Sequence, residues 1–240
     1  MDWRGRERDP MFVFMTRRRY DGCVSRSAEV RRILERYLVE VVERHALCPW
    51  ARAARERGEL AVGILWGEPA LEAWVAEAAR LLAAPGTRVA MVVGPEAALT
   101  RPALAALRDQ VAARLSAAGV AEFHPDAALD LETPARLVPF LRRSPDPMLQ
   151  LVPLALIDDA RASRAGGAGA PDLAQQAAML GGRAAPVREL TDEIAAANHA
   201  TVAVAHAAIS AVLDDIAADR RAAYARAGIT GVSRERRSSR

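Results

Sequence analysis

The run Val89-Ala90-Met91-Val92-Val93 is apolar at every position and is followed directly by Gly94-Pro95. A short, unbroken apolar run that stops at a turn signal is typical of a strand buried on both of its faces. Such a strand needs a packing layer on each side of the sheet, because neither row of its side chains suits water. The run therefore predicts a layered α/β fold.

Strand and helix signals alternate on both sides of this run. Further strands are expected where short apolar stretches lie between turn signals, at 60–66, 120–123 and 148–153. Helices are expected where apolar residues recur at helical spacing, at 27–47, 49–57, 69–84, 102–118 and 134–141. Strands separated by helices of this length predict a single layered α/β domain with a mixed or partly parallel sheet flanked by helices, plus a long C-terminal helix.

Shifts in composition divide the 240 residues into five segments. The α/β core is expected over 27–161, and a helix packing on that core is expected over 188–228. Between them, an Ala/Gly-rich loop or insert is expected over 162–187. A flexible basic leader (1–26) and a basic tail (229–240) would complete the chain at its two ends.

The chain contains no lysine, so all of its basic residues apart from histidine are arginine. This absence excludes pyridoxal phosphate and other lysine-dependent cofactors, because these need a primary amine at the site. It also excludes a phosphate-loop lysine. Arginine cannot replace lysine as a base or nucleophile, since the guanidinium stays protonated at any working pH.

Composition also indicates the cellular location and limits the kinds of binding partner. Cys23 and Cys48 are the only cysteines, so a disulfide framework is not expected and a reducing cytoplasm is the predicted location. We find no unbroken apolar run of about 18 residues, which predicts no membrane span. The net charge is +3, with arginines gathered near both ends. Such basic tails predict at most weak, salt-dependent binding of nucleic acid.

Cys48 precedes Pro49, a residue well suited to the first position of a helix. This order places Cys48 at the N-cap of the helix expected over 49–57, facing unpaired N–H groups. That position would lower the pKa of the thiol and favour the thiolate. Cysteine is equally common as a small buried apolar residue, so both interpretations stay open.

The stretch Phe123-His124-Pro125-Asp126 lies at the end of a predicted strand, where α/β proteins place their chemistry. One hypothesis is a thiol-dependent hydrolase, transferase or redox enzyme. In it Cys48 is the nucleophile, His124 the general acid–base and Asp126 the orienting carboxylate. A small, anionic substrate would be held by three further residues, Arg143, Ser144 and Gln150.

Two other hypotheses use the same residues differently. In the first, Cys48, His124 and Asp126 bind a divalent metal, with Gln150 or water completing the shell. In the second, the protein is a non-catalytic interaction domain: His124 and Asp126 cap a turn, and Arg143 pairs with Asp126. No cofactor is assigned from the sequence, although the first of these hypotheses allows a divalent metal. The oligomeric state is left open.

Three segments in this order resemble the uncharacterised bacterial family "domain of unknown function 1415". That family has a Leu-Cys-Pro-Phe-Ala motif, a Phe-His-Pro-Asp motif and an Arg-Ser-Pro-x-Pro segment, which match 47–51, 123–126 and 143–147 here. The likeness covers roughly residues 30 to 160. Trp50 replaces the phenylalanine of the first motif, and Gln150 stands where the family tends to have a histidine. The resemblance implies a family but no reaction.

Overall fold

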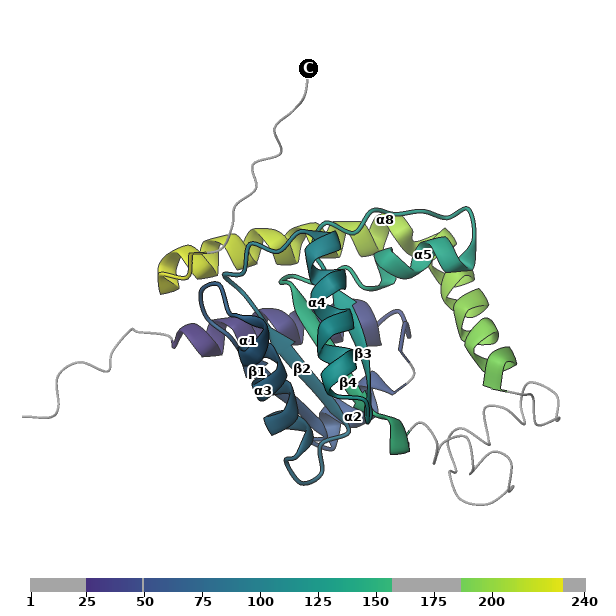
Figure 1. The fold of residues 1–240 in the computed structure, drawn as a ribbon. Helices are drawn as coiled ribbons and strands as arrows, with labels where there is room; N and C mark the ends of the chain where they lie inside the picture. The colour runs from purple at the N-terminus through teal and green to yellow at the C-terminus, as the bar shows by residue number, and fades with distance from the viewer. Residues whose placement is uncertain (1–24, 49, 157–186, 231–240) are drawn as a thin grey trace, which may run out of the picture.

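A mixed sheet of four strands organises the chain in this computed structural model, which describes residues 25–48, 50–156 and 187–230 (Figure 1). The strands pair in the spatial order β1-β2-β4-β3. Their bounds are Leu60–Ile64 for β1, Val89–Val93 for β2, Ala118–Phe123 for β3 and Met148–Pro153 for β4. The α/β fold predicted from the sequence is confirmed.

Strand direction decides which loops meet. β1 and β2 are parallel, whereas β4 runs antiparallel to both β2 and β3, between which it lies. The carboxyl ends of β1, β2 and β3 therefore lie at one end of the sheet, together with the start of β4. Loops that are far apart in the sequence meet at this end, including the segment after Phe123 and the segment before Met148.

One face of the sheet is covered by α3 (Leu71–Leu82) and α4 (Arg101–Arg114). Ala90 and Val92 of β2 point to this face, where they pack with Trp74 of α3 and Leu104 of α4. Each large apolar side chain that is fully buried here contributes about 1.5–3 kcal/mol to stability.

The other face is covered by α1 (Arg26–Tyr37), a π-helical turn η1 (Leu38–Glu43), α5 (Pro134–Leu141) and α8 (Val187–Ala227). Met91 and Val93 of β2 point to this face, so the central run is buried on both sides as its sequence predicts. Figure 1 shows the C-terminal, yellow part of α8 lying alongside α1. The buried residues that α8 contributes include Val202, Ile209, Leu213, Ile216, Ala223 and Tyr224.

Ion pairs join the two long helices of this layer. Asp219 of α8 accepts hydrogen bonds from Arg32 and Arg36 of α1, each at 2.7 Å. These arginines hold the pKa of the Asp219 carboxyl well below its usual range, with Arg32 having the larger effect. Helix α1 continues directly into η1, where the sequence predicted one unbroken α-helix as far as Leu47.

A segment of α8, Ile194–Ala227, is the one helix in the described ranges that is long and apolar enough to cross a membrane, with a mean hydropathy of 1.5. The core helices of soluble proteins can share this length and composition; in this helix 22% of the most apolar 18-residue window is buried, and Val204 is 89% exposed. The predicted leader, insert and basic tail fall almost wholly outside the described residues.

Candidate functional site

His124 follows β3 directly and is held in place by main-chain atoms. Its backbone N–H donates to the carbonyl oxygen of Arg142 at 3.0 Å. Its ring Nε2 lies 2.8 Å from the carbonyl oxygen of Leu99, and its ring Nδ1 accepts from the backbone N–H of Asp126 at 3.0 Å. Because a carbonyl oxygen only accepts, these partners assign the ring proton to Nε2.

The imidazole of His124 therefore fixes a turn. It is only 8% exposed, and both of its nitrogens are already engaged. Nδ1 has no proton to give to the carboxylate of Asp126, so the orienting contact predicted for that carboxylate is made by the main-chain N–H instead. Asp126 is an exposed residue.

Cys48 lies beside the helix α2 (Ala51–Glu56), packed against the core under α1 and α8. The residue before the first turn of α2 is Trp50, so the N-cap position predicted for Cys48 is wrong. Burial raises the pKa of the Cys48 thiol, and this effect outweighs the nearby N–H groups of Trp50 and Ala51, which lower it. The thiolate predicted from the helix start is thus disfavoured.

Cys48 and His124 have different surroundings. Cys48 packs on the α1/α8 face, whereas the His124 ring is bonded to main-chain atoms of Leu99 and Asp126. Cys48, His124 and Asp126 do not form a group that could hold a metal ion, and neither do any other three such side chains among the described residues.

The three predicted substrate-binding residues have separate surroundings. Arg143 donates to the carboxylate of Asp214 and to the carbonyl oxygen of Pro125, each at 3.2 Å, so its partner is not Asp126. Ser144 is buried and donates to the carbonyl oxygen of Asp146 at 2.5 Å. The side chain of Gln150 shares a face of β4 with that of Met148, which packs on the α1/α8 side.

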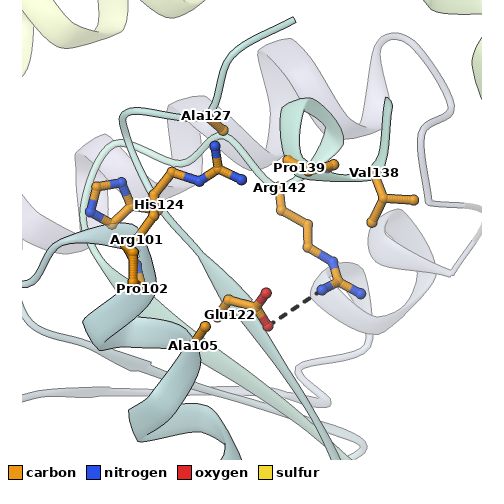
Figure 2. A pocket seen from close by; sticks show the side chains of 9 residues that line it. All are labelled: Arg101, Pro102, Ala105, Glu122, His124, Ala127, Val138, Pro139 and Arg142. Atoms are coloured by element: carbon orange, nitrogen blue, oxygen red, sulfur yellow. Dashed lines mark hydrogen bonds and ion pairs between the residues drawn. The ribbon is translucent and has the colours of Figure 1, made fainter. Parts of the chain in front are cut away.

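A cleft of about 480 Å³ opens at the carboxyl end of β3, between α4 and α5 (Figure 2). Four polar side chains and five small apolar ones line it: Arg101, Glu122, His124 and Arg142, with Pro102, Ala105, Ala127, Val138 and Pro139. Of the residues predicted to form a site, only His124 is among them. It serves as a fixed wall of the cleft.

The cleft carries a net positive charge, because two guanidinium groups face one carboxylate. Glu122 lies 3.4 Å from Arg142 and 3.3 Å from Arg108, so its charge is already shared. Arg101 makes no ion pair with any carboxylate of the described residues. Figure 2 shows its guanidinium extending past His124 toward Ala127, away from Glu122.

Sequence patterns missed Arg101, Glu122 and Arg142. Arg101 stands between the capping residue Thr100 and Pro102, at a helix start, where an arginine gives no signal of its own. Arg142 directly precedes Arg143, and neighbouring residues at the end of a helix point in different directions. Only the fold decides which of the two arginines faces the cleft.

No family model, curated protein or solved structure matches this chain. The resemblance to "domain of unknown function 1415" therefore stays a prediction, and the function is inferred from the cleft at the end of β3.

Proposed function

We propose that this protein binds a small organic anion in the cleft between α4 and α5. The observation that carries the proposal is the pair of guanidinium groups, Arg101 and Arg142, in one partly enclosed cleft. Guanidinium groups present several N–H donors in a planar fork, which suits carboxylate and phosphate oxygens. The proposal keeps the anionic ligand predicted from the sequence and moves its binding site.

Arg101 is the primary anion-binding group in this proposal. Its charge has no carboxylate partner among the described residues, whereas that of Arg142 is partly offset by Glu122. An anion entering the cleft would meet Arg101 first and draw Arg142 from Glu122, which keeps Arg108 as a partner. Binding therefore would not leave Glu122 without a counter-charge.

The apolar part of the lining indicates that the anion has an apolar body. Pro102 and Ala105 of α4 face the cleft with Val138 and Pro139 of α5. These side chains have no polar atoms with which to hold a second charged group. An aliphatic carboxylate would place its charge at the arginines and its chain against these walls.

The proposal assigns binding and no bond-making step. Both ring nitrogens of His124 are bonded to main-chain atoms, and Cys48 is not among the residues that line the cleft and has a thiol pKa raised by burial. Neither is placed to attack or to exchange protons with a ligand in this cleft. A thiol enzyme built on Cys48 and His124 is therefore not the function that the geometry favours.

Titration of ¹⁵N-labelled protein with sodium hexanoate, followed by amide chemical shifts, tests the proposal. We expect saturable shifts at the amides of Glu122, His124 and Ala127. Hexanamide has the same chain without the charge, and it should cause no comparable shifts. Replacing Arg101 by Ala should weaken hexanoate binding by about tenfold or more, since charge-assisted hydrogen bonds are the strong ones.

Arg221→Ala is the matched control for Arg101→Ala. It removes an exposed arginine on α8, outside the residues that line the cleft. Its hexanoate affinity should equal that of the unmodified protein. Equal shifts with hexanoate and hexanamide, or equal affinities for the two variants, would show that the arginines of the cleft do not bind the anion.

A further inference from the structure

The outer edge of β3 borders the cleft, and its hydrogen-bonding groups can be assigned from the register. Leu154 donates to the carbonyl oxygen of Ala117 at 2.8 Å, in line with the pairing of β3 and β4. In an antiparallel pair, the residues that bond across the ladder alternate with those that do not. The N–H and C=O groups of Val120 and Glu122 therefore point away from β4.

These outward groups of Val120 and Glu122 have no backbone partner in the part of the chain that the structure describes. At the neighbouring outward-facing positions on the same edge, Ala118 and His124, the backbone N–H is already bonded. Ala118 donates to the carbonyl oxygen of Leu115 at 2.9 Å, and His124 donates to that of Arg142 at 3.0 Å. A short length of open sheet edge is left, and such an edge can pair with another strand.

The open edge ends at the positive part of the cleft. Glu122 lies on the edge and also lines the cleft, which α4 and α5 flank with apolar side chains. The carbonyl oxygen of Arg142 already accepts from the backbone N–H of His124. A strand added to this edge must therefore end beside Glu122. Arg101 and Arg142 lie at that end, where the added strand would stop.

We infer that the ligand of this cleft is the carboxy-terminal end of an extended peptide, which adds to β3 as a parallel strand. The parallel direction follows from charge: only then does the terminal carboxylate meet Arg101 and Arg142 at the closed end. Main-chain hydrogen bonds to Val120 and Glu122 would supply affinity, and the apolar walls would take the side chains of the last residues. This inference rests on the anion-binding function proposed above and names its ligand class.

Three probes separate the parts of this inference in titrations with ¹⁵N-labelled protein. The first is the peptide acid acetyl-Gly-Ala-Val-Val, the second is its C-terminal amide, and the third is the same acid N-methylated at the peptide bond before the last valine. The acid should bind about tenfold or more tightly than hexanoate, because it adds main-chain hydrogen bonds to the same charge contact. The amide should lose the charge contact and the N-methylated acid the added main-chain hydrogen bonds, so each should bind more weakly than the acid.

A change in the protein tests the same edge. Val120→Pro removes an N–H that points outward and leaves the ladder to β4 intact, and proline is tolerated at such edge positions. This variant should bind the peptide acid no more tightly than hexanoate, while its affinity for hexanoate is unchanged. The N-methylated peptide gives the same comparison in the unmodified protein if Val120→Pro fails to fold.

The outcomes distinguish the two proposals. If hexanoate binds through Arg101 but the peptide acid binds no better, the peptide inference is overturned and the anion-binding function stands. If neither probe binds, both fail. If sedimentation shows a dimer that Val120→Pro abolishes, a second copy of the chain covers the edge, and this overturns the peptide inference.

Discussion

Arg220 of α8 donates to the carboxylate of Asp146, in the turn before β4, with Nε and Nη2 at 2.7 and 2.6 Å from Oδ1. Tyr224, one helical turn further on, donates to the other carboxylate oxygen at 2.6 Å. The side chains of Asp146 and Arg220 are 5% and 15% exposed, so the pair is largely removed from water. This contact fixes α8 to the end of the sheet at which the cleft opens.

Arg220→Ala should lower the free energy of unfolding by about 3–5 kcal/mol, because it leaves the buried carboxylate of Asp146 without its counter-charge. The guanidinium also lies 4.4 Å from the centre of the Tyr224 ring, and this contact would be lost as well. Urea unfolding followed by circular dichroism measures the change. Arg221→Ala, at the exposed neighbouring position, should change stability by less than about 0.5 kcal/mol. Equal losses in the two variants would contradict the assigned role of Arg220.

Gly94, directly after β2, has no room for a side chain. A Cβ there would lie 2.9 Å from Cη2 of Trp74 and 3.0 Å from Cβ of Ala97, and Trp74 is fully buried. Gly94→Ala should therefore cost about 1–3 kcal/mol of stability, as overpacking of a core does. Gly63→Ala is the matched change in β1, because the three atoms nearest to its Cβ all belong to the flexible side chain of Glu77, which can move aside. It should cost clearly less in the same unfolding experiment, and a larger loss at Gly63 would refute this reading of the packing.

The sequence predicted the layers of the fold better than the direction of its strands. Val89–Val93 is apolar at every position, and an unbroken apolar run predicts burial on both faces in any topology. The run Met148–Pro153 carries no comparable signal for direction, and its antiparallel insertion between β2 and β3 depends on contacts distant in sequence. The parallel pairing of β1 with β2 agrees with the helix that separates them.

The candidate site was less predictable, because residue spacing does not say which face of a sheet a loop will reach. Cys48 and His124 look like partners in the sequence, yet in the fold Cys48 packs under α1 and α8 and only His124 lines the cleft. Arg101 gives no motif, and it becomes a candidate only because α4 starts beside the end of β3. An anionic ligand stays a prediction, and the arginine expected to hold it, Arg143, is engaged with Asp214.

Acidification should destabilise the fold through Glu43, whose carboxylate accepts from Arg55 at 2.7 and 2.9 Å. The Arg55 hydrogen bonds lower the pKa of Glu43 from its ordinary value of 4.5, so the unfolded chain binds this proton more readily than the folded one. The contact between Glu43 and Arg55 contributes its full stabilisation above about pH 4.5. This stabilisation is lost as the pH falls through the lower pKa that Glu43 has in the folded protein.

Urea midpoints measured between about pH 7 and pH 3 should therefore fall most steeply below about pH 4.5. Glu43→Gln should flatten this dependence and lower stability at neutral pH. Asp219→Asn should have a similar effect, since Arg32 and Arg36 lower the pKa of Asp219 in the same way. A steep acid transition that persists unchanged in both variants would place the responsible carboxylates elsewhere.

The Cys48 thiol should react slowly in the folded protein. Burial raises its pKa, and Cys48 packs beside Tyr37, whose own pKa burial also raises. A raised pKa leaves less thiolate at neutral pH, and the thiolate is the reactive form. Alkylation by iodoacetamide at about pH 7.5 should thus be slower than for the same residue in the urea-unfolded chain. Mass spectrometry of the peptide containing Cys48 gives both rates, with the unfolded chain as the control. A folded rate equal to or above the unfolded one would mean that the helix start, and not burial, controls this thiol, and the thiol-enzyme hypothesis would regain its nucleophile.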